Sequence, residues 1–171
     1  LIEEFGLKDR LTTGSDFEPL LHLYALEGEK AFERLRGMYA FCLIGCDGRT
    51  WLVRDPFGIK PLYFTGYEGG LAFASEARAL KDAKAHDLDL TRVDQLLSLN
   101  YTLDCGDRGS VFSGVWRMPP GIVMELRGEE TLIARSPIPP RRPAPSEPAL
   151  DALDRVLEDS VRVHQRSDVP Y

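Results

Sequence analysis

The sequence predicts an α+β domain built mostly from antiparallel sheets. Short apolar runs recur along the chain at the spacing of β-hairpins, and segments with helical periodicity stand before and after them. Hydrophobic residues make up 43% of the chain, which is enough for a buried core. With 171 residues and no internal repeat, the chain has room for one domain and the beginning of a second.

The first clear helix is expected to start near residue 15. Ser15 is followed three residues later by Glu18, which is the spacing of a capping box. Pro19 falls in the first turn, where a missing N–H group costs little. Leucines and a tyrosine then form an apolar face up to about Glu27.

Other helical signals are shorter. Helical segments are also expected at residues 1–11, as the end of a helix that begins earlier, and at residues 29–35, 76–81 and 91–97. Thr91 is expected to cap the last of these, with Asp94 in its first turn.

The strands are expected to be short and joined by tight turns. They are predicted at residues 38–45, 50–53, 62–65, 71–74, 115–118, 122–126 and 131–134. The dipeptide Asp47-Gly48 predicts a two-residue hairpin loop. Residues 54–61 are expected to form a loop, because two prolines and a glycine interrupt them. Further turns are expected at residues 68–70, Gly121 and Gly128.

The composition changes near residue 137. Residues 137–148 are rich in proline and predict a stiff, extended linker. The apolar spacing of Leu150, Leu153, Val156 and Leu157 then predicts an amphipathic helix. We therefore expect a domain at residues 1–136, a linker at 137–148, and the first helix of a second, truncated domain at 149–171.

The charge balance excludes several classes of protein. The chain carries 27 acidic and 21 basic residues, a formal net charge of −6, which argues against nucleic-acid or anionic-membrane partners. No apolar stretch is long enough to span a bilayer, and the first residues, Leu-Ile-Glu-Glu-Phe, lack the basic start of a secretory signal. A cytoplasmic location is the expectation.

Three cysteines do not form a recognisable metal or disulfide pattern. An odd, small number makes a disulfide framework improbable. Cys42 and Cys46 are expected on one face of a strand, and no matching cysteine pair or histidine cluster follows them, so no zinc site or other metal site is predicted. All three thiols, including Cys105, are expected to be buried and inert. The three histidines, His22, His86 and His164, are scattered and receive no role.

Several motifs occur in an order that resembles one enzyme family. They are Thr13-Gly14-Ser15-Asp16, Arg36-Gly37-Met38-Tyr39-Ala40-Phe41, the run from Arg54 to Tyr63 (RDPFGIKPLY), Phe73-Ala74-Ser75-Glu76, Met118-Pro119-Pro120-Gly121, Leu157–Val161 and Ser167–Tyr171. The pattern Arg-Asp-Pro-x-Gly-x-x-Pro-Leu-Tyr is typical of the glutaminase domain of class II amidotransferases. The closing Ser-Asp-Val-Pro-Tyr is similar to the asparagine synthetase branch, whereas the proline-rich linker without a Tyr-Trp pair departs from it and leaves the branch open.

The resemblance implies a fold and a reaction. The fold would be a four-layer αββα sandwich of antiparallel sheets, of the N-terminal-nucleophile hydrolase type, incomplete at its N-terminus. Residues 1–136 would be most of the amidotransferase domain, and residues 149–171 would begin the ATP-pyrophosphatase (synthetase) domain. In this family an N-terminal cysteine attacks the amide of glutamine, and the ammonia released amidates an aspartate that ATP has activated.

The resemblance also implies that both reaction centres lie outside these 171 residues. None of the three cysteines stands where the nucleophile belongs, and the family's glutamine-binding Arg, its Asn-Gly oxyanion pair and its ATP loop would lie beyond the two ends. No catalytic residue is therefore assigned, and the isolated chain is expected to be inactive. No cofactor is expected on this segment, whereas ATP and Mg²⁺ are implied for the parent enzyme, with glutamine, aspartate and ATP as its substrates. A homodimer is left open.

Three residues of these motifs are candidates for a role. Asp16 matches the family's aspartate that binds the α-ammonium group of glutamine, although an acid at a helix start also has a purely structural explanation. Arg54 and Asp55 are interpreted as a structural corner held by an Arg–Asp interaction, not as catalytic groups. The aromatic residues Tyr63, Phe64 and Phe73 are expected in the core.

Two other functions stay open from the sequence. A glutaminase-like scaffold could serve as a non-catalytic module for docking or dimerisation. An amidotransferase of the same type could instead act on another acceptor, as in lactam-forming or peptide-modifying relatives.

Overall fold

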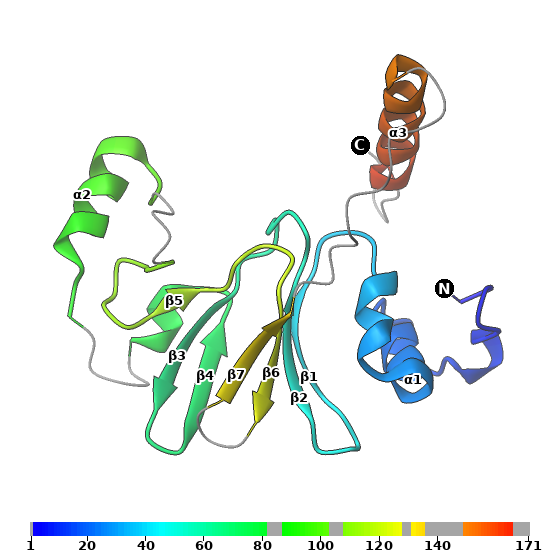
Figure 1. The fold of residues 1–171 in the computed structure, drawn as a ribbon, viewed down its shortest axis with the longest axis horizontal. Coiled ribbons are helices and arrows are strands. Elements are labelled where there is room, and N and C mark those ends of the chain that lie inside the picture. Colours follow the sequence, from blue (N-terminus) through cyan, green and yellow to red (C-terminus); the bar gives the residue numbers. More distant parts are fainter. Residues whose placement is uncertain (1, 82–86, 103–107, 128–130, 136–148, 166–171) are drawn as a thin grey trace. The chain divides into compact units, whose positions relative to one another are not determined.

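The fold was analysed in a computed structural model, which describes residues 2–81, 87–102, 108–127, 131–135 and 149–165 (Figure 1). The chain divides into two compact units, Leu1–Ile138 and Pro139–Tyr171. The first unit contains two antiparallel sheets together with helices, which confirms the predicted α+β class. The second unit contains one described helix.

The first unit holds all described strands. They are β1 (Ala40–Ile44), β2 (Thr50–Arg54), β3 (Tyr63–Tyr67), β4 (Gly70–Ala74), β5 (Trp116–Arg117), β6 (Val123–Arg127) and β7 (Thr131–Arg135). One sheet has the order β1-β2-β6-β7 and the other the order β4-β3-β5, with every neighbouring pair antiparallel. All seven predicted strands are therefore present, each within two residues of its expected ends.

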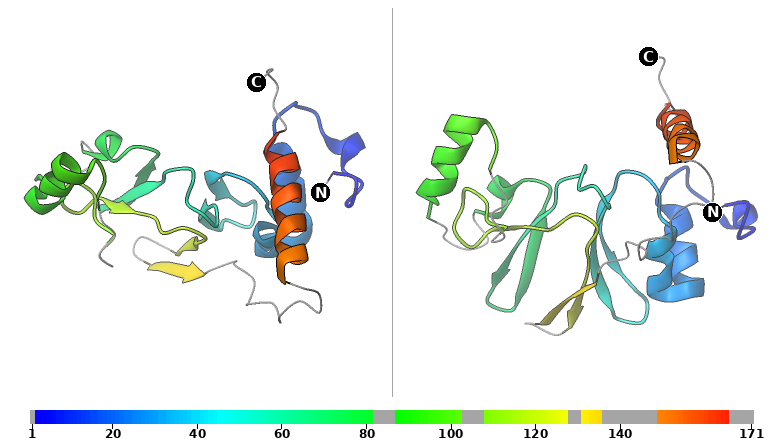
Figure 2. Two further views of the ribbon diagram at one scale, coloured as in Figure 1. Left: turned by 90° about the horizontal axis from the view of Figure 1, so that it is seen from above. Right: turned by 45° about the horizontal axis from the view of Figure 1, so that its top comes forward.

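Strand β2 of the four-stranded sheet is buried on both of its faces. Successive side chains of a strand point to opposite faces, so Trp51 and Val53 of β2 face one way and Leu52 the other. Trp51 and Val53 pack in a cluster with Leu23 and Phe32, which belong to helix α1 (Glu18–Glu27) and the 3-10 helix η2 (Gly28–Arg34). Figure 1 and Figure 2 show α1 beside β1 and β2.

The opposite face of the same sheet meets the three-stranded sheet. Leu52 and Met124 pack there against Leu62 and Met118, with Phe64 of β3 at the edge of the cluster. The central sheet thus separates two cores, one shared with helices and one shared with the second sheet. Such complete burial explains why β2 reads as a nearly continuous apolar run and not as an alternating pattern.

Two predicted helix starts are wrong. Helix α1 begins at Glu18, and no side chain caps its first turn, because Glu18 turns back to an earlier segment and leaves Ser15 one turn before the helix. Helix α2 (Leu90–Leu99) begins before Thr91 and is capped by Asp89, whose carboxylate accepts a 3.1 Å hydrogen bond from the Arg92 N–H group. An aspartate is at least as good an N-cap as a threonine, so the earlier residue is used.

Three other helical segments are short. Residues 29–35 and 76–81 are helical as predicted, in the tighter 3-10 form of η2 and η3 (Ala77–Leu80). The helix expected at residues 1–11 is wrong, since the described part forms turns and the 3-10 helix η1 (Lys8–Arg10). Gly6 weakens helical propensity in the middle of that segment.

The hairpin between β1 and β2 differs in detail from its prediction. The Gly45 N–H group bonds to the Arg49 carbonyl at 2.8 Å, which leaves a three-residue loop in place of the expected two. Gly48 has a φ of +77° in this loop, a value that glycine adopts without strain. Because the strand ends at Ile44, Cys46 lies in the loop and is exposed, so it neither shares a strand face with Cys42 nor is buried as expected.

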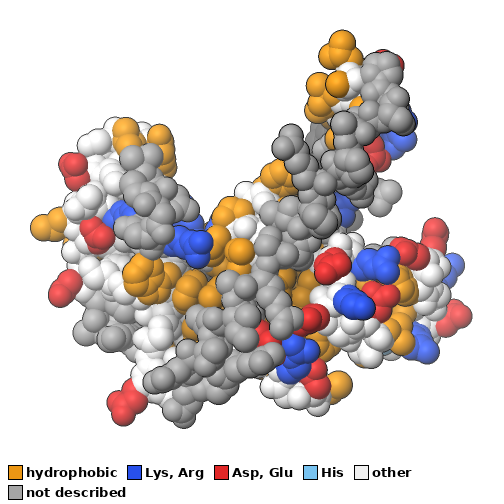
Figure 3. Space-filling model, viewed as in Figure 1, with side chains coloured by type: hydrophobic (Ala, Val, Ile, Leu, Met, Phe, Trp, Pro, Cys, Tyr) orange, Lys and Arg blue, Asp and Glu red, His pale blue; other side chains and the backbone are white. Residues whose placement is uncertain are grey.

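The second unit contains the predicted amphipathic helix, α3 (Ala149–His164). Its apolar residues Leu150, Leu153, Val156, Leu157 and Val161 are all more than half exposed. Figure 3 shows hydrophobic side chains at the surface of α3. The predicted linker at 137–148 and the final Ser167–Tyr171 motif lie outside the described residues.

Candidate functional site

Asp16 stands in a short loop that leads into helix α1. Its side chain is exposed, and its carboxylate makes no hydrogen bond or ion pair with any residue of the described ranges. An ionised carboxylate in this state keeps its full capacity to accept charge-assisted hydrogen bonds from an ammonium group. The position therefore suits the binding role that the motif predicts for Asp16.

The loop around Asp16 is held by Glu18, the first residue of α1. Glu18 Oε1 accepts hydrogen bonds from the backbone N–H of Thr12 at 2.6 Å and from its hydroxyl at 2.8 Å. Glu18 Oε2 accepts bonds from the N–H and the hydroxyl of Thr13, both at 2.7 Å. These bonds from Thr12 and Thr13 lower the pKa of Glu18 from 4.5 to about 2.

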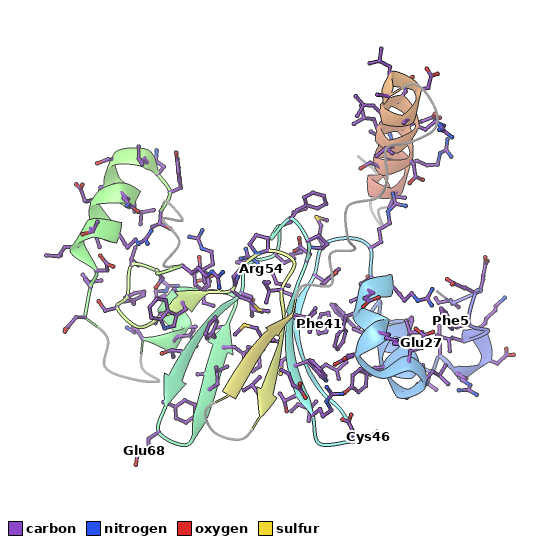
Figure 4. All side chains as sticks on the ribbon, in the orientation of Figure 1. Phe5, Glu27, Phe41, Cys46, Arg54 and Glu68 are labelled. Carbon is purple, nitrogen blue, oxygen red and sulfur yellow. The ribbon has the colours of Figure 1, made fainter. Side chains whose placement is uncertain are left out.

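The residue between Asp16 and Glu18 fastens the loop to the sheet. The ring of Phe17 packs edge-on against Phe41 of β1, with 5.6 Å between the ring centroids. Figure 4 shows Phe41 pointing from the sheet toward α1. Phe41 in turn contacts Phe32 of η2, so the Asp16 loop is tied to the core that the sheet shares with the helices.

Arg54 holds a second loop together. From the end of β2, its buried guanidinium donates to the carbonyl groups of Lys60 at 2.8 Å, Gly58 at 2.7 Å and Met118. Burial, and then the nearby positive charge of Arg117, lower the pKa of Arg54. Figure 4 places Arg54 at the ends of the strands, where the loops of both sheets meet.

Asp55 completes this corner from the opposite side of the chain. Its carboxylate accepts hydrogen bonds from the backbone N–H groups of Phe57, Ile59 and Lys60 at 3.0–3.1 Å. Burial alone would raise the pKa of Asp55, but the bonds from these N–H groups outweigh it and lower the pKa. Its backbone also bonds to Tyr39 and to Gly121, so three separate loops converge on one residue.

The corner interpretation is confirmed, but the expected Arg–Asp pair is not. Within the described residues, Arg54 and Asp55 each bond to backbone groups and not to each other. Successive residues of an extended chain point in opposite directions, which carries the two side chains apart. The Gly58 backbone bonds to both residues. Gly58 has a φ of +63°, and a Cβ atom there would come within 2.9 Å of Pro120 and 3.1 Å of Arg54.

The remaining candidates show no catalytic arrangement. Cys42 is half-buried, and burial raises the pKa of its thiol. Phe64 packs in the second core as expected, Tyr63 is partly buried, and Phe73 is 45% exposed, so the core prediction is wrong for Phe73. His22 lies 4.0 Å from Glu18. Cys105, His86 and the side chain of His164 lie outside the described residues.

Neither a cluster of metal-ligating side chains nor a helix of membrane-spanning length occurs in the described ranges. No group of three or more histidine, cysteine, aspartate or glutamate side chains there could hold a metal ion. None of the helices in the described part of the chain has the length and apolar character needed to cross a membrane.

Glu18 is the residue that sequence reasoning missed. The spacing of Ser15 and Glu18 indicated a local capping box, whereas the carboxylate reaches five and six residues back. The neighbouring pair Thr12-Thr13 offers four donors to one acidic side chain and was the available signal.

Comparison with known proteins identifies relatives along the whole chain. Residues 2–135 match the glutamine amidotransferase domain family. The chain is 42% identical over 171 residues to Asparagine synthetase B [glutamine-hydrolyzing] of Escherichia coli, which covers 98% of the chain and 26% of the relative. It is 31% identical over 163 residues to Asparagine synthetase [glutamine-hydrolyzing] 1 of Bacillus subtilis, covering 92% of the chain and 25% of that relative. The chain thus spans about a quarter of the length of these relatives.

Proposed function

The chain belongs to the glutamine amidotransferase domain family, and on that basis we propose that it is part of a glutamine-hydrolysing asparagine synthetase. The parent protein would release ammonia from glutamine and use it for the ATP-dependent amidation of aspartate. Similarity to synthetases that hydrolyse glutamine, over nearly the whole chain, supports this assignment. The proposal divides the chain into an amidotransferase domain at 1–136, a linker at 137–148 and the start of a synthetase domain at 149–171, and the family match over residues 2–135 supports the first of these.

The fold proposal is the four-layer αββα sandwich. Two packed antiparallel sheets with helices on the outer face of one of them are compatible with it. The ATP and Mg²⁺ of the parent reaction are proposed to bind in other parts of the parent protein. A cytoplasmic location and a homodimeric parent protein belong to the same proposal.

Asp16 is proposed to bind the α-ammonium group of glutamine. The observation that carries this role is an exposed carboxylate, without a partner among the described residues, on a loop that is hydrogen-bonded at both ends. In such a site the aspartate holds glutamine by its α-ammonium group and leaves the side-chain amide free to meet the nucleophile. This arrangement contributes orientation, which lowers the entropic part of the barrier.

A kinetic experiment on the full-length protein tests the role of Asp16. We expect Asp16→Ala to raise the KM for glutamine by about tenfold or more, because one charge-assisted hydrogen bond is lost. Ammonia-dependent synthesis should stay unchanged, since ammonia needs no ammonium contact. Asp94→Ala is the matched control, because Asp94 is exposed on α2. An unchanged KM for glutamine in Asp16→Ala would remove Asp16 from the site.

A further inference from the structure

Glu18 is a buried acid that the proposed reaction does not use. It is only 9% exposed, although it is the first residue of a helix, where an acidic side chain normally stays in solvent near the positive end of the helix dipole. Both of its oxygens are occupied by donors from two consecutive residues, Thr12 and Thr13. Four bonds of 2.6–2.8 Å to one carboxylate are more than a helix start requires.

These bonds close a loop with Asp16 inside it. Within the loop, the Ser15 N–H donates to the Thr13 hydroxyl at 3.2 Å, and the Phe17 N–H donates to the Ser15 hydroxyl at 3.3 Å. The Glu18 N–H also donates to the Ser15 carbonyl at 3.2 Å. The residues on both sides of Asp16 are therefore held by hydrogen bonds, whereas the Asp16 carboxylate itself is left open.

We propose that Glu18 is a positioning residue that sets the direction of the Asp16 carboxylate toward the glutamine ammonium. The inference rests on the proposed function, because it needs Asp16 to bind glutamine. Glu18 does not touch the substrate in this scheme. It fixes the Thr12–Glu18 loop, so that Asp16 is oriented before glutamine arrives and little loop entropy is lost on binding.

The protonation state of Glu18 agrees with this role. Hydrogen bonds from the Thr12 and Thr13 groups lower its pKa to about 2, so the carboxylate is ionised at neutral pH and accepts from all four donors. A glutamine at this position keeps the size of the side chain but offers a single oxygen, and its NH₂ group cannot accept from Thr13 or Thr12. The substitution therefore loosens the loop without removing the helix start.

The first experiment compares single variants of the full-length protein. We expect Glu18→Gln to raise the KM for glutamine about five- to tenfold, because two of the four hydrogen bonds are lost. The kcat with saturating glutamine and the rate of ammonia-dependent synthesis should change less than about twofold by the same reasoning, since neither depends on how Asp16 is aimed. Glu33→Gln is the matched control, because Glu33 is exposed on η2. Its substitution should leave the KM for glutamine and the rate of ammonia-dependent synthesis unchanged.

A double variant separates positioning from a general effect on stability. If Glu18 acts through Asp16, Glu18→Gln combined with Asp16→Ala should show no higher KM for glutamine than Asp16→Ala alone. Additive effects would overturn the inference, and so would an equal loss of glutamine-dependent and ammonia-dependent activity. A normal KM in Glu18→Gln alongside a raised KM in Asp16→Ala would also overturn it and leave the proposed function standing.

Two further outcomes are decisive: one tests the proposed function itself, and the other applies if Glu18→Gln does not fold. A normal KM for glutamine in Asp16→Ala would overturn the proposed site and the inference with it. If Glu18→Gln fails to fold, Thr13→Val decides, because it removes one donor to Glu18 and the acceptor of the Ser15 N–H group. Its KM for glutamine should rise about two- to threefold because these two hydrogen bonds are lost, and an unchanged value would contradict the positioning role.

Discussion

At the scale of single residues, the pKa of Glu18 predicts a pH dependence of stability that can be measured without an activity assay. Its pKa of about 2 in the folded chain lies below the ordinary value of 4.5. A group with a depressed folded pKa stabilises the folded state above its unfolded pKa, and that contribution is lost as the pH falls through the folded value. We expect the free energy of unfolding to decline between about pH 5 and pH 2 less steeply in Glu18→Gln than in the wild type.

Urea denaturation of both chains at several pH values measures this difference. Glu33→Gln again serves as the control, since Glu33 is exposed and forms no hydrogen bond or ion pair with the residues that the structure describes. Identical declines in the wild type and in Glu18→Gln would show that the carboxylate is not held by Thr12 and Thr13 in solution.

The same residue marks a limit of sequence interpretation. The Ser15–Glu18 spacing predicted the helix start to within three residues but the wrong partner for Glu18. Local spacing rules describe contacts within one turn of a helix, whereas Glu18 bonds to an extended segment before it. Asp16 could be proposed from its motif, but its exposure and the bonds that hold its neighbours could not.

At the scale of an element, the corner between β2 and β3 depends on Arg54. We expect Arg54→Met to lower the free energy of unfolding by about 2–4 kcal/mol, because the carbonyl groups of Gly58, Lys60 and Met118 lose their donor and the Met118 residue is fully buried. Methionine keeps much of the apolar stem, so the loss reports mainly on hydrogen bonding. Chemical denaturation of the folded chain is the measurement.

The control for Arg54 is an arginine that stays in solvent. Arg78, whose side chain is 80% exposed beside Glu76, should tolerate the same substitution within about 0.5 kcal/mol. Equal effects at the two positions would mean that the corner does not contribute to stability.

The corner also shows which part of an element the sequence determines. Proline and glycine predicted the loop at 54–61, and the loop is present. The partner of Arg54 was wrong, because one of its acceptors, the Met118 carbonyl, lies 64 residues away and no local pattern indicates it. The position of the hairpin at Asp47-Gly48 could be predicted, because the residues that set the turn are adjacent in the chain.

At the scale of the whole first unit, the central sheet joins two cores through neighbouring residues of β2. Leu52 is fully buried between the sheets. We expect Leu52→Ala to lower the free energy of unfolding by about 2–5 kcal/mol, because it leaves a cavity beside Met118 and Met124. Ile44→Ala, at a position 75% exposed, should cost less than about 1 kcal/mol by comparison.

Thermal or urea unfolding of the two variants tests whether the second core is tightly packed. A small effect of Leu52→Ala, close to that of Ile44→Ala, would mean that the two sheets are not in firm contact. The sequence predicted the fold class and the strands, but not this layering. Nothing local indicates that β2 pairs with β6 while β3 pairs with β5, since both choices follow from long-range packing.

The pairing of β2 sets an order of events during synthesis on the ribosome. Its partner β1 is joined to it by a three-residue loop and can pair at once, whereas β6 emerges only about seventy residues later. Contacts between residues so far apart in the sequence form slowly, because a long loop must close before they can form. Until Met118 and β6 arrive, a nascent chain carries an apolar strand edge and an arginine without its last acceptor, and it is in this interval that the protein is most exposed to aggregation and to chaperones.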